Sequence, residues 1–211
     1  MEWKAAIFDL DGTLLDSMWV WDRLLIDYLA QYGCEVYPEI LTEVTYMTIQ
    51  QSSKYIKEQY DLPLEAQQIM QQWRDMVFDY YQSKISMKAG AKEYLYRLHN
   101  SGVKLAIATS CMDELCEVAL KAHGVYDWFD VIVYSNEVGK SKEHPDIYLE
   151  CAKRMGVEIS DCMLFEDILT AVNTARGIGL KVTVVEDEFA QPEQEALRLE
   201  ADCYIRDFTE L

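Results

Sequence analysis

Two aspartates lie two positions apart near the start of the chain, in the segment IFDLDGTLLD that begins at Ile7. Carboxylates as close as those of Asp9 and Asp11 repel each other, and both stay ionised most easily when a cation lies between them. Magnesium prefers a few carboxylates together with water and phosphate oxygens. One carboxylate can then attack a phosphorus atom while the other handles the proton of the leaving group. The alternative is an ordinary Asp-Gly turn at the end of a strand, and this segment alone does not decide between the two.

Three further polar segments each follow an apolar, strand-like run. The hydroxyls of Thr109 and Ser110, ahead of a helix start, can form a phosphate cradle with backbone amides. Lys142 also precedes a helix start, where its charge is repelled by the positive end of the helix dipole. A bound anion would explain a lysine at this place. Glu166 and Asp167 place two more carboxylates at the end of a strand. Each segment has a plainer alternative, which is a helix cap at Ser110 or Asp167 and a solvated side chain at Lys142.

Parallel strands would bring these segments together, because ligands of such sheets bind at the carboxyl ends of the strands. We therefore expect four carboxylates at neighbouring strand ends, those of Asp9, Asp11, Glu166 and Asp167. Four carboxylates cannot share one site without positive charge nearby. Lys142 and a divalent cation would supply that charge, so the sequence predicts a site for Mg²⁺ and a phosphorylated substrate.

The elements that must position this site alternate along the chain from about residue 87. Short apolar runs of the kind buried on both faces of a parallel sheet lie at 103–108, 131–134, 162–165, 182–185 and 203–205, after a first strand at 4–9. Helical patterns, each followed by a glycine, lie between them at 89–100, 112–123, 145–155 and 169–178. The predicted fold class is α/β, with a Rossmann-like parallel sheet core and helices on both faces.

Residues 17–86 interrupt this alternation. They carry no strand signal, and apolar positions such as Trp21, Leu24 and Tyr28 recur at helical spacing. We interpret them as an inserted α-helical cap domain, with residues 1–16 and 87–211 forming the core domain. The cap would be inserted near the carboxyl end of the first strand, where the site is expected.

The composition restricts the partners of the protein. The chain has 211 residues, of which 50% are hydrophobic, and a formal net charge of −18, so it predicts a globular protein that repels nucleic acid and anionic membranes. No apolar stretch reaches the roughly 18 residues that a membrane helix needs. The start of the chain lacks a signal peptide pattern, so we expect a cytoplasmic protein with six reduced cysteines. We expect a monomer or a weak homodimer.

The D-x-D-G-T-L-x-D-S segment and the order of the three later motifs resemble the haloacid dehalogenase superfamily, in its β-phosphoglucomutase-like branch with a helical cap. The resemblance extends over essentially the whole chain. It implies a magnesium-dependent phosphatase in which Asp9 is the nucleophile that forms an aspartyl-phosphate. Asp11 would be the general acid for the leaving group and then the base for water.

The same resemblance assigns roles to the later motifs. Thr109 and Lys142 would bind the transferring phosphoryl group, and Ser110 is the further candidate beside them. The implied Mg²⁺ ligands are Asp9, the backbone carbonyl of Asp11, and Asp167, with Glu166 in or next to that shell. Two positions depart from the family pattern, since Glu143 replaces a proline after Lys142 and Ile168 replaces the serine after Asp167.

A third departure concerns the reaction. Sugar-phosphate mutases of this branch have a histidine in the first cap helix, where this chain has Trp21. A tryptophan cannot transfer a proton, so hydrolysis of a small phosphorylated metabolite is favoured over mutase chemistry. Trp19 and Trp21 either form the substrate side of the cap or pack between its helices. Two alternatives stay open at this stage: a sugar phosphomutase and a phosphate-binding module without catalysis.

Overall fold

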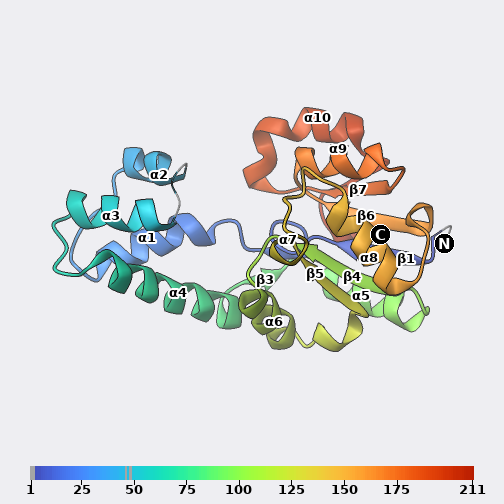
Figure 1. Cartoon of the computed structure of the whole chain (residues 1–211), viewed down its shortest axis with the longest axis horizontal. Coiled ribbons are helices and arrows are strands. Elements are labelled where there is room, and N and C mark those ends of the chain that lie inside the picture. Colours follow the sequence, from blue (N-terminus) through green and yellow to red (C-terminus); the bar gives the residue numbers. More distant parts are fainter. Residues whose placement is uncertain (1–2, 46, 48) are drawn as a thin grey trace. The chain divides into compact units, whose positions relative to one another are not determined.

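The computed structural model describes residues 3–45, 47 and 49–211 (Figure 1). The chain divides into two compact units. One comprises Met1–Met18 and Ile85–Leu211, and the other comprises Trp19–Lys84.

The first unit is built on a six-stranded parallel sheet with the strand order β5-β4-β1-β6-β7-β8. Its strands are β1 (Ala5–Phe8), β4 (Lys104–Thr109), β5 (Val131–Tyr134), β6 (Cys162–Glu166), β7 (Lys181–Val185) and β8 (Cys203–Ile205). Every residue of β1 is buried, because β1 lies in the sheet between β4 and β6 and is covered on both faces. The apolar runs of the sequence are therefore strands, and the predicted α/β class is confirmed.

Helices cover both faces of this sheet. Alternate residues of β1, such as Ala5 and Ile7, belong to one buried cluster with side chains of α8 (Asp146–Met155), α9 (Leu169–Gly177) and α10 (Gln194–Glu200). Phe8 faces the other way and stacks on Phe165 with ring centroids 4.5 Å apart. In this second layer, Tyr94 of α5 (Ala91–Asn100) packs against Phe165, with ring centroids 5.5 Å apart. The helix α6 (Asp113–Ala122) follows β4 in the chain. Crossovers between parallel strands are right-handed. The chain runs from β1 toward β5 along the sheet and from β6 toward β8 in the opposite direction, so the connecting helices lie on opposite faces.

Short elements complete the first unit. They are α7 (Ser135–Val138) and the 3₁₀ turns η1 (Tyr126–Trp128), η2 (Ile159–Asp161), η3 (Glu188–Glu193) and η4 (Phe208–Glu210). A two-stranded antiparallel ribbon, β2 (Leu15–Asp16) with β3 (Ser86–Met87), lies where the chain leaves this unit and returns to it. The sequence patterns did not indicate this ribbon, because strands of two residues are too short to show an alternation.

The second unit is entirely helical in its described residues. It contains α1 (Val20–Ala30), α2 (Pro38–Thr45), α3 (Ile49–Gln59) and α4 (Ala66–Ser83). Tyr28 of α1 packs edge-on against Trp73 of α4, with ring centroids 5.7 Å apart. A capping box between Glu65 and Gln68 begins α4. Among the residues that the structure describes, no helix is long and apolar enough to cross a membrane.

Candidate active site

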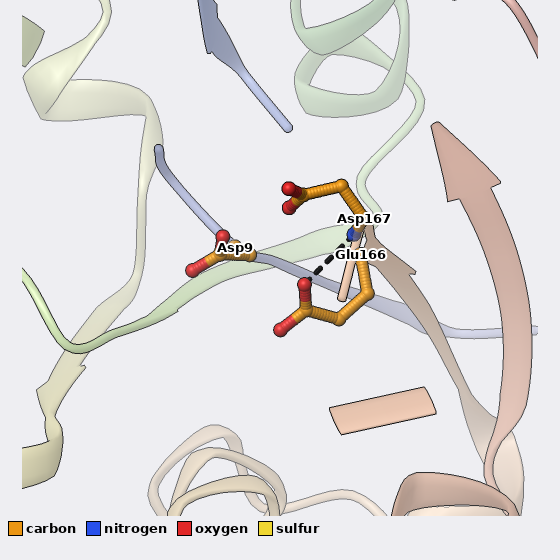
Figure 2. Close-up of side chains that lie close together, drawn as sticks. All are labelled: Asp9, Glu166 and Asp167. Carbon is orange, nitrogen blue, oxygen red and sulfur yellow. Dashed lines mark hydrogen bonds between the residues drawn. The ribbon is translucent and has the colours of Figure 1, made fainter. Parts of the chain in front are cut away.

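The site lies where the direction of the chain through the sheet reverses. From β1 the chain continues to β4 and β5 on one side, and from β6 it continues to β7 and β8 on the other. Ligands of open α/β sheets bind beyond the carboxyl ends of the strands at such a point. Asp9 directly follows β1, Glu166 is the last residue of β6, and Asp167 comes next (Figure 2).

The structure brings three of the predicted carboxylates together. Asp9, Glu166 and Asp167 each offer an oxygen that lies within 4.8 Å of the others, and all three side chains are buried. Burial, together with the charge of Glu166, raises the pKa of Asp9 to about 7. The same two causes raise the pKa of Asp167 well above its usual value. Three buried carboxylates therefore need more positive charge than they have from the protein alone.

Lys142 is the cation that the protein supplies to this cluster. Its ammonium donates to Asp9 and, at 2.6 Å, to Oε1 of Glu166. Burial opposes the charged form, but the carboxylates of Asp9 and Glu166 outweigh burial and raise the pKa of Lys142 well above its usual value. Oε2 of Glu166 accepts from the backbone amides of Asp167 and Ile168, at 2.8 and 3.3 Å. Both oxygens of Glu166 are thus engaged within the protein.

Gly12 and Thr13 position Asp167. Gly12 has a φ of +84°, and a Cβ added to it would lie 2.4 Å from Oδ2 of Asp167. The hydroxyl of Thr13 donates to Oδ1 of the same carboxylate at 2.7 Å, and this bond is buried. Sequence reasoning did not identify Thr13 as a site residue. Its only signal was its place directly after the Asp-Gly pair.

The carboxylate of Asp11 lies outside the three-carboxylate cluster. It is half-buried, and its Oδ1 accepts a hydrogen bond from the Ser17 hydroxyl at 2.7 Å. Of the four carboxylates expected at neighbouring strand ends, the structure therefore brings together three. A carboxyl group beside the cluster can serve as a general acid or base where it lies within hydrogen-bond reach of the reacting group.

The two predicted hydroxyl residues follow the neighbouring strand β4. Phe8 is level with Ile107 in the sheet, so Thr109 lies one residue beyond the level of Asp9. Thr109 is buried, and its Oγ1 accepts from the amide of Cys111 at 3.0 Å. Ser110 is exposed and shares a hydrogen bond of 2.9 Å with the hydroxyl of Ser135.

The two cap tryptophans have different surroundings within the helical unit. Trp19 packs against Tyr80 of α4, with ring centroids 5.9 Å apart. Trp21 is 48% exposed, which makes it one of the large apolar side chains on the surface of the described chain. Packing between helices thus accounts for Trp19 and leaves Trp21 unexplained.

The donor set of the cluster fits a divalent metal ion. Its ligands are hard carboxylate oxygens, and when all three are ionised their negative charges exceed the single charge of Lys142 by two. The hydrogen bonds described above engage both oxygens of Glu166 but one oxygen each of Asp9 and Asp167. Asp9 and Asp167 are therefore the better placed of the three to hold the ion.

Comparison with known proteins identifies the family of the chain. Residues 6–185 match the family described as haloacid dehalogenase-like hydrolase. The chain is 31% identical over 209 residues to a bifunctional riboflavin kinase/FMN phosphatase of Arabidopsis thaliana, and the match covers 99% of this chain and 54% of that protein. It is 25% identical to hexitol phosphatase B of Escherichia coli, with 98% and 93% of the two chains covered.

A solved structure shares the fold. The crystal structure of CbbY from Rhodobacter sphaeroides in complex with phosphate has a TM-score of 0.76 and 24% identity, and the match covers 99% of this chain and 96% of that one. The family match extends over most of the sheet and includes each motif that contributes to the cluster. The chain belongs to the haloacid dehalogenase-like hydrolase family.

Proposed function

We propose that this protein is a magnesium-dependent phosphatase that hydrolyses a small phosphomonoester through an aspartyl-phosphate on Asp9. The observation that supports it most is the cluster of Asp9, Asp167 and Lys142 at the reversal point of the sheet. Relatives named as phosphatases of FMN and of hexitol phosphates support the same reaction class. The chain spans about half of the bifunctional relative. We take the phosphatase part of that name as the relevant one, because the chain matches a hydrolase family.

The reaction requires two displacements at phosphorus. In the first, a carboxylate oxygen of Asp9 forms a bond to phosphorus, the ester P–O bond breaks, and Asp11 gives its proton to the leaving oxygen. In the second, Asp11 takes a proton from water, the water oxygen bonds to phosphorus, and the bond from Asp9 to phosphorus breaks. Phosphate is released, and both carboxylates return to their starting states.

The remaining residues orient the phosphoryl group and neutralise its charge. Lys142 would donate to a phosphoryl oxygen from its place between Asp9 and Glu166, and Thr109 would donate from the end of β4. Held by Asp9, Asp167 and the backbone carbonyl of Asp11, Mg²⁺ would supply the positive charge that phosphoryl transfer needs. The helical unit would act as the cap that selects the substrate, and Trp21, exposed within that unit, is its candidate contact.

Water is the proposed acceptor of the phosphoryl group. A mutase would need a side chain that transfers protons at the position of Trp21. The indole of tryptophan cannot do this, because its N–H only donates hydrogen bonds. The expected product is therefore inorganic phosphate.

The test is a phosphate-release assay on FMN, hexitol phosphates, other sugar phosphates and p-nitrophenyl phosphate, with Mg²⁺ present. Asp9→Asn keeps the size of the side chain but removes the nucleophile, so we expect at least a thousandfold loss of kcat. Circular dichroism of Asp9→Asn checks that the fold is kept. The proposal is wrong if no substrate turns over faster with the native chain than with Asp9→Asn. Transfer of phosphate to a second sugar hydroxyl as the main outcome would favour the mutase instead.

A further inference from the structure

A buried ion pair joins two segments of the first unit that are far apart in sequence. The ammonium of Lys88 donates to Oδ2 of Asp187 at 2.7 Å and to the backbone carbonyl of Glu186 at 2.9 Å. The two charged side chains are 13% and 3% exposed. Removing two charges from water is costly, and an apolar pair at such a place often stabilises a protein as well.

The pair fixes the β2–β3 ribbon to the end of β7. Lys88 directly follows β3, and Asp187 lies two residues beyond β7. The backbone amide of Lys88 also donates to the carbonyl of Leu14 at 2.8 Å. Since Asp16 pairs with Ser86 in the ribbon, a shift of Lys88 would move both strands together.

The ribbon in turn holds the segment that carries Asp11. The amide of Gly12 donates to the carbonyl of Leu15 at 2.9 Å, which closes the loop between Asp11 and β2. Ser17 is the first residue after β2, and its hydroxyl donates to Oδ1 of Asp11 at 2.7 Å. Ser17 is only 1% exposed and Asp11 is half-buried, so this bond is partly shielded from water. A continuous set of contacts therefore connects Asp187, through Lys88 and the ribbon, to the carboxylate of Asp11.

We propose that Lys88 is a positioning residue that fixes the ribbon to Asp187, so that the carboxylate of Asp11 meets the leaving oxygen of the substrate. This inference rests on the proposed phosphatase function and concerns one step of it. A displacement of about 1 Å at a catalytic group can cost about a hundredfold in rate. Within the described chain, Lys88 makes no contact with the carboxylate cluster, so the pair of Asp9 with Lys142 does not depend on it directly.

This role has a signature that general destabilisation lacks. An alkyl phosphate needs a proton on its leaving oxygen, whereas p-nitrophenolate leaves without one. The value of kcat/KM reports on the first displacement, in which Asp11 acts as the acid. Loss of Lys88 should therefore lower kcat/KM for an alkyl phosphate far more than for p-nitrophenyl phosphate.

The experiment measures kcat/KM for p-nitrophenyl phosphate and for the alkyl phosphate that the native chain hydrolyses best, with saturating Mg²⁺. In Lys88→Met we expect a 10- to 100-fold loss on the alkyl phosphate and at most a threefold loss on the aryl phosphate. Asp187→Asn should show the same selectivity, and it provides the test if Lys88→Met does not fold. Lys88→Arg keeps the charge and should restore the native ratio of the two values.

Leu197→Ala is the control for lost stability, because Leu197 is buried on α10 and forms no part of the ribbon. It should leave the ratio of the two kcat/KM values unchanged. Equal losses on both substrates in Lys88→Met and Asp187→Asn, or no loss in either, would overturn the role of Lys88 and leave the phosphatase proposal intact. A native chain that hydrolyses neither substrate would overturn the phosphatase proposal, and the role of Lys88 with it.

Discussion

Replacing Gly12 by alanine tests how tightly the loop after Asp9 is packed against the carboxylate cluster. Gly12 has a φ of +84°, a conformation that costs a residue with a Cβ about 1–2 kcal/mol. The added Cβ would also lie 2.4 Å from Oδ2 and 2.9 Å from Cγ of Asp167. Overpacking of this kind costs about 1–3 kcal/mol, because the buried carboxylate has to move. We therefore expect Gly12→Ala to lower the free energy of unfolding by about 2–5 kcal/mol.

Gly179→Ala separates the two contributions. Gly179 has nearly the same φ, +81°, but no atom lies within 4 Å of the position of its Cβ. Its replacement should cost only the conformational part, about 1–2 kcal/mol. Urea unfolding of both variants, followed by circular dichroism at one pH, gives the difference directly. That difference is the cost of displacing Asp167.

The displacement should also weaken metal binding. Disturbing a group that orients a metal ligand typically lowers affinity about 10- to 100-fold. Calorimetric titration with Mg²⁺ should show that loss in Gly12→Ala and native affinity in Gly179→Ala. Equal unfolding free energies for the two variants, together with unchanged Mg²⁺ affinity, would refute the argument that Gly12 is required by the close approach of Asp167.

Two further predictions concern single contacts. Thr13→Val keeps the shape but removes the donor to Asp167, so we expect a loss of about 1.5–3 kcal/mol in urea unfolding, with Thr13→Ser close to native. His123 has a pKa lowered by burial, which outweighs its hydrogen bond to the carbonyl of Ile85. A lowered pKa favours the neutral ring in the folded state, so its stabilisation is present above about pH 6.5 and is lost as the pH falls through the folded pKa. An NMR titration should give a pKa below 6.5, and His123→Gln should remove this part of the pH dependence of unfolding.

The sheet was predictable because its strands are buried on both faces. Such strands must be apolar almost throughout, and this makes them visible as short runs in the sequence. The site followed from the same reasoning, since polar residues that end buried strands meet at one edge. Asp9, Glu166 and Asp167 are an example, because their places depend only on where β1 and β6 end and on the order of the strands.

The contacts that orient these residues were not predictable in the same way. Lys88 and Asp187 are 99 positions apart, and Thr13 and Asp167 are 154 apart. The residues around a lysine or a threonine in a turn form no pattern that would indicate a partner so far away in the sequence. The Ser17 hydroxyl likewise donates to the Asp11 carboxylate, and hydrophobic periodicity cannot indicate such a bond. Hydrophobic periodicity indicates which residues are buried, whereas individual hydrogen bonds determine the orientation of a polar side chain.

Both oxygens of Glu166 accept hydrogen bonds within the protein, so its contribution to the site lies in its contact with Lys142. If Lys142 faced Asp9 alone, the ammonium would form a closed pair with the nucleophile and hold it back from phosphorus. Oε1 of Glu166 competes for the same ammonium at 2.6 Å, and the amides of Asp167 and Ile168 fix Glu166 from its other oxygen. Lys142 is thereby shared between two carboxylates. Under the proposed mechanism, its charge would stay in the site when Asp9 becomes bonded to phosphorus. Under the proposed function, Glu166 would hold Lys142 in place for the phosphoryl group, and Asp9 and Asp167 would be left to bind the metal ion.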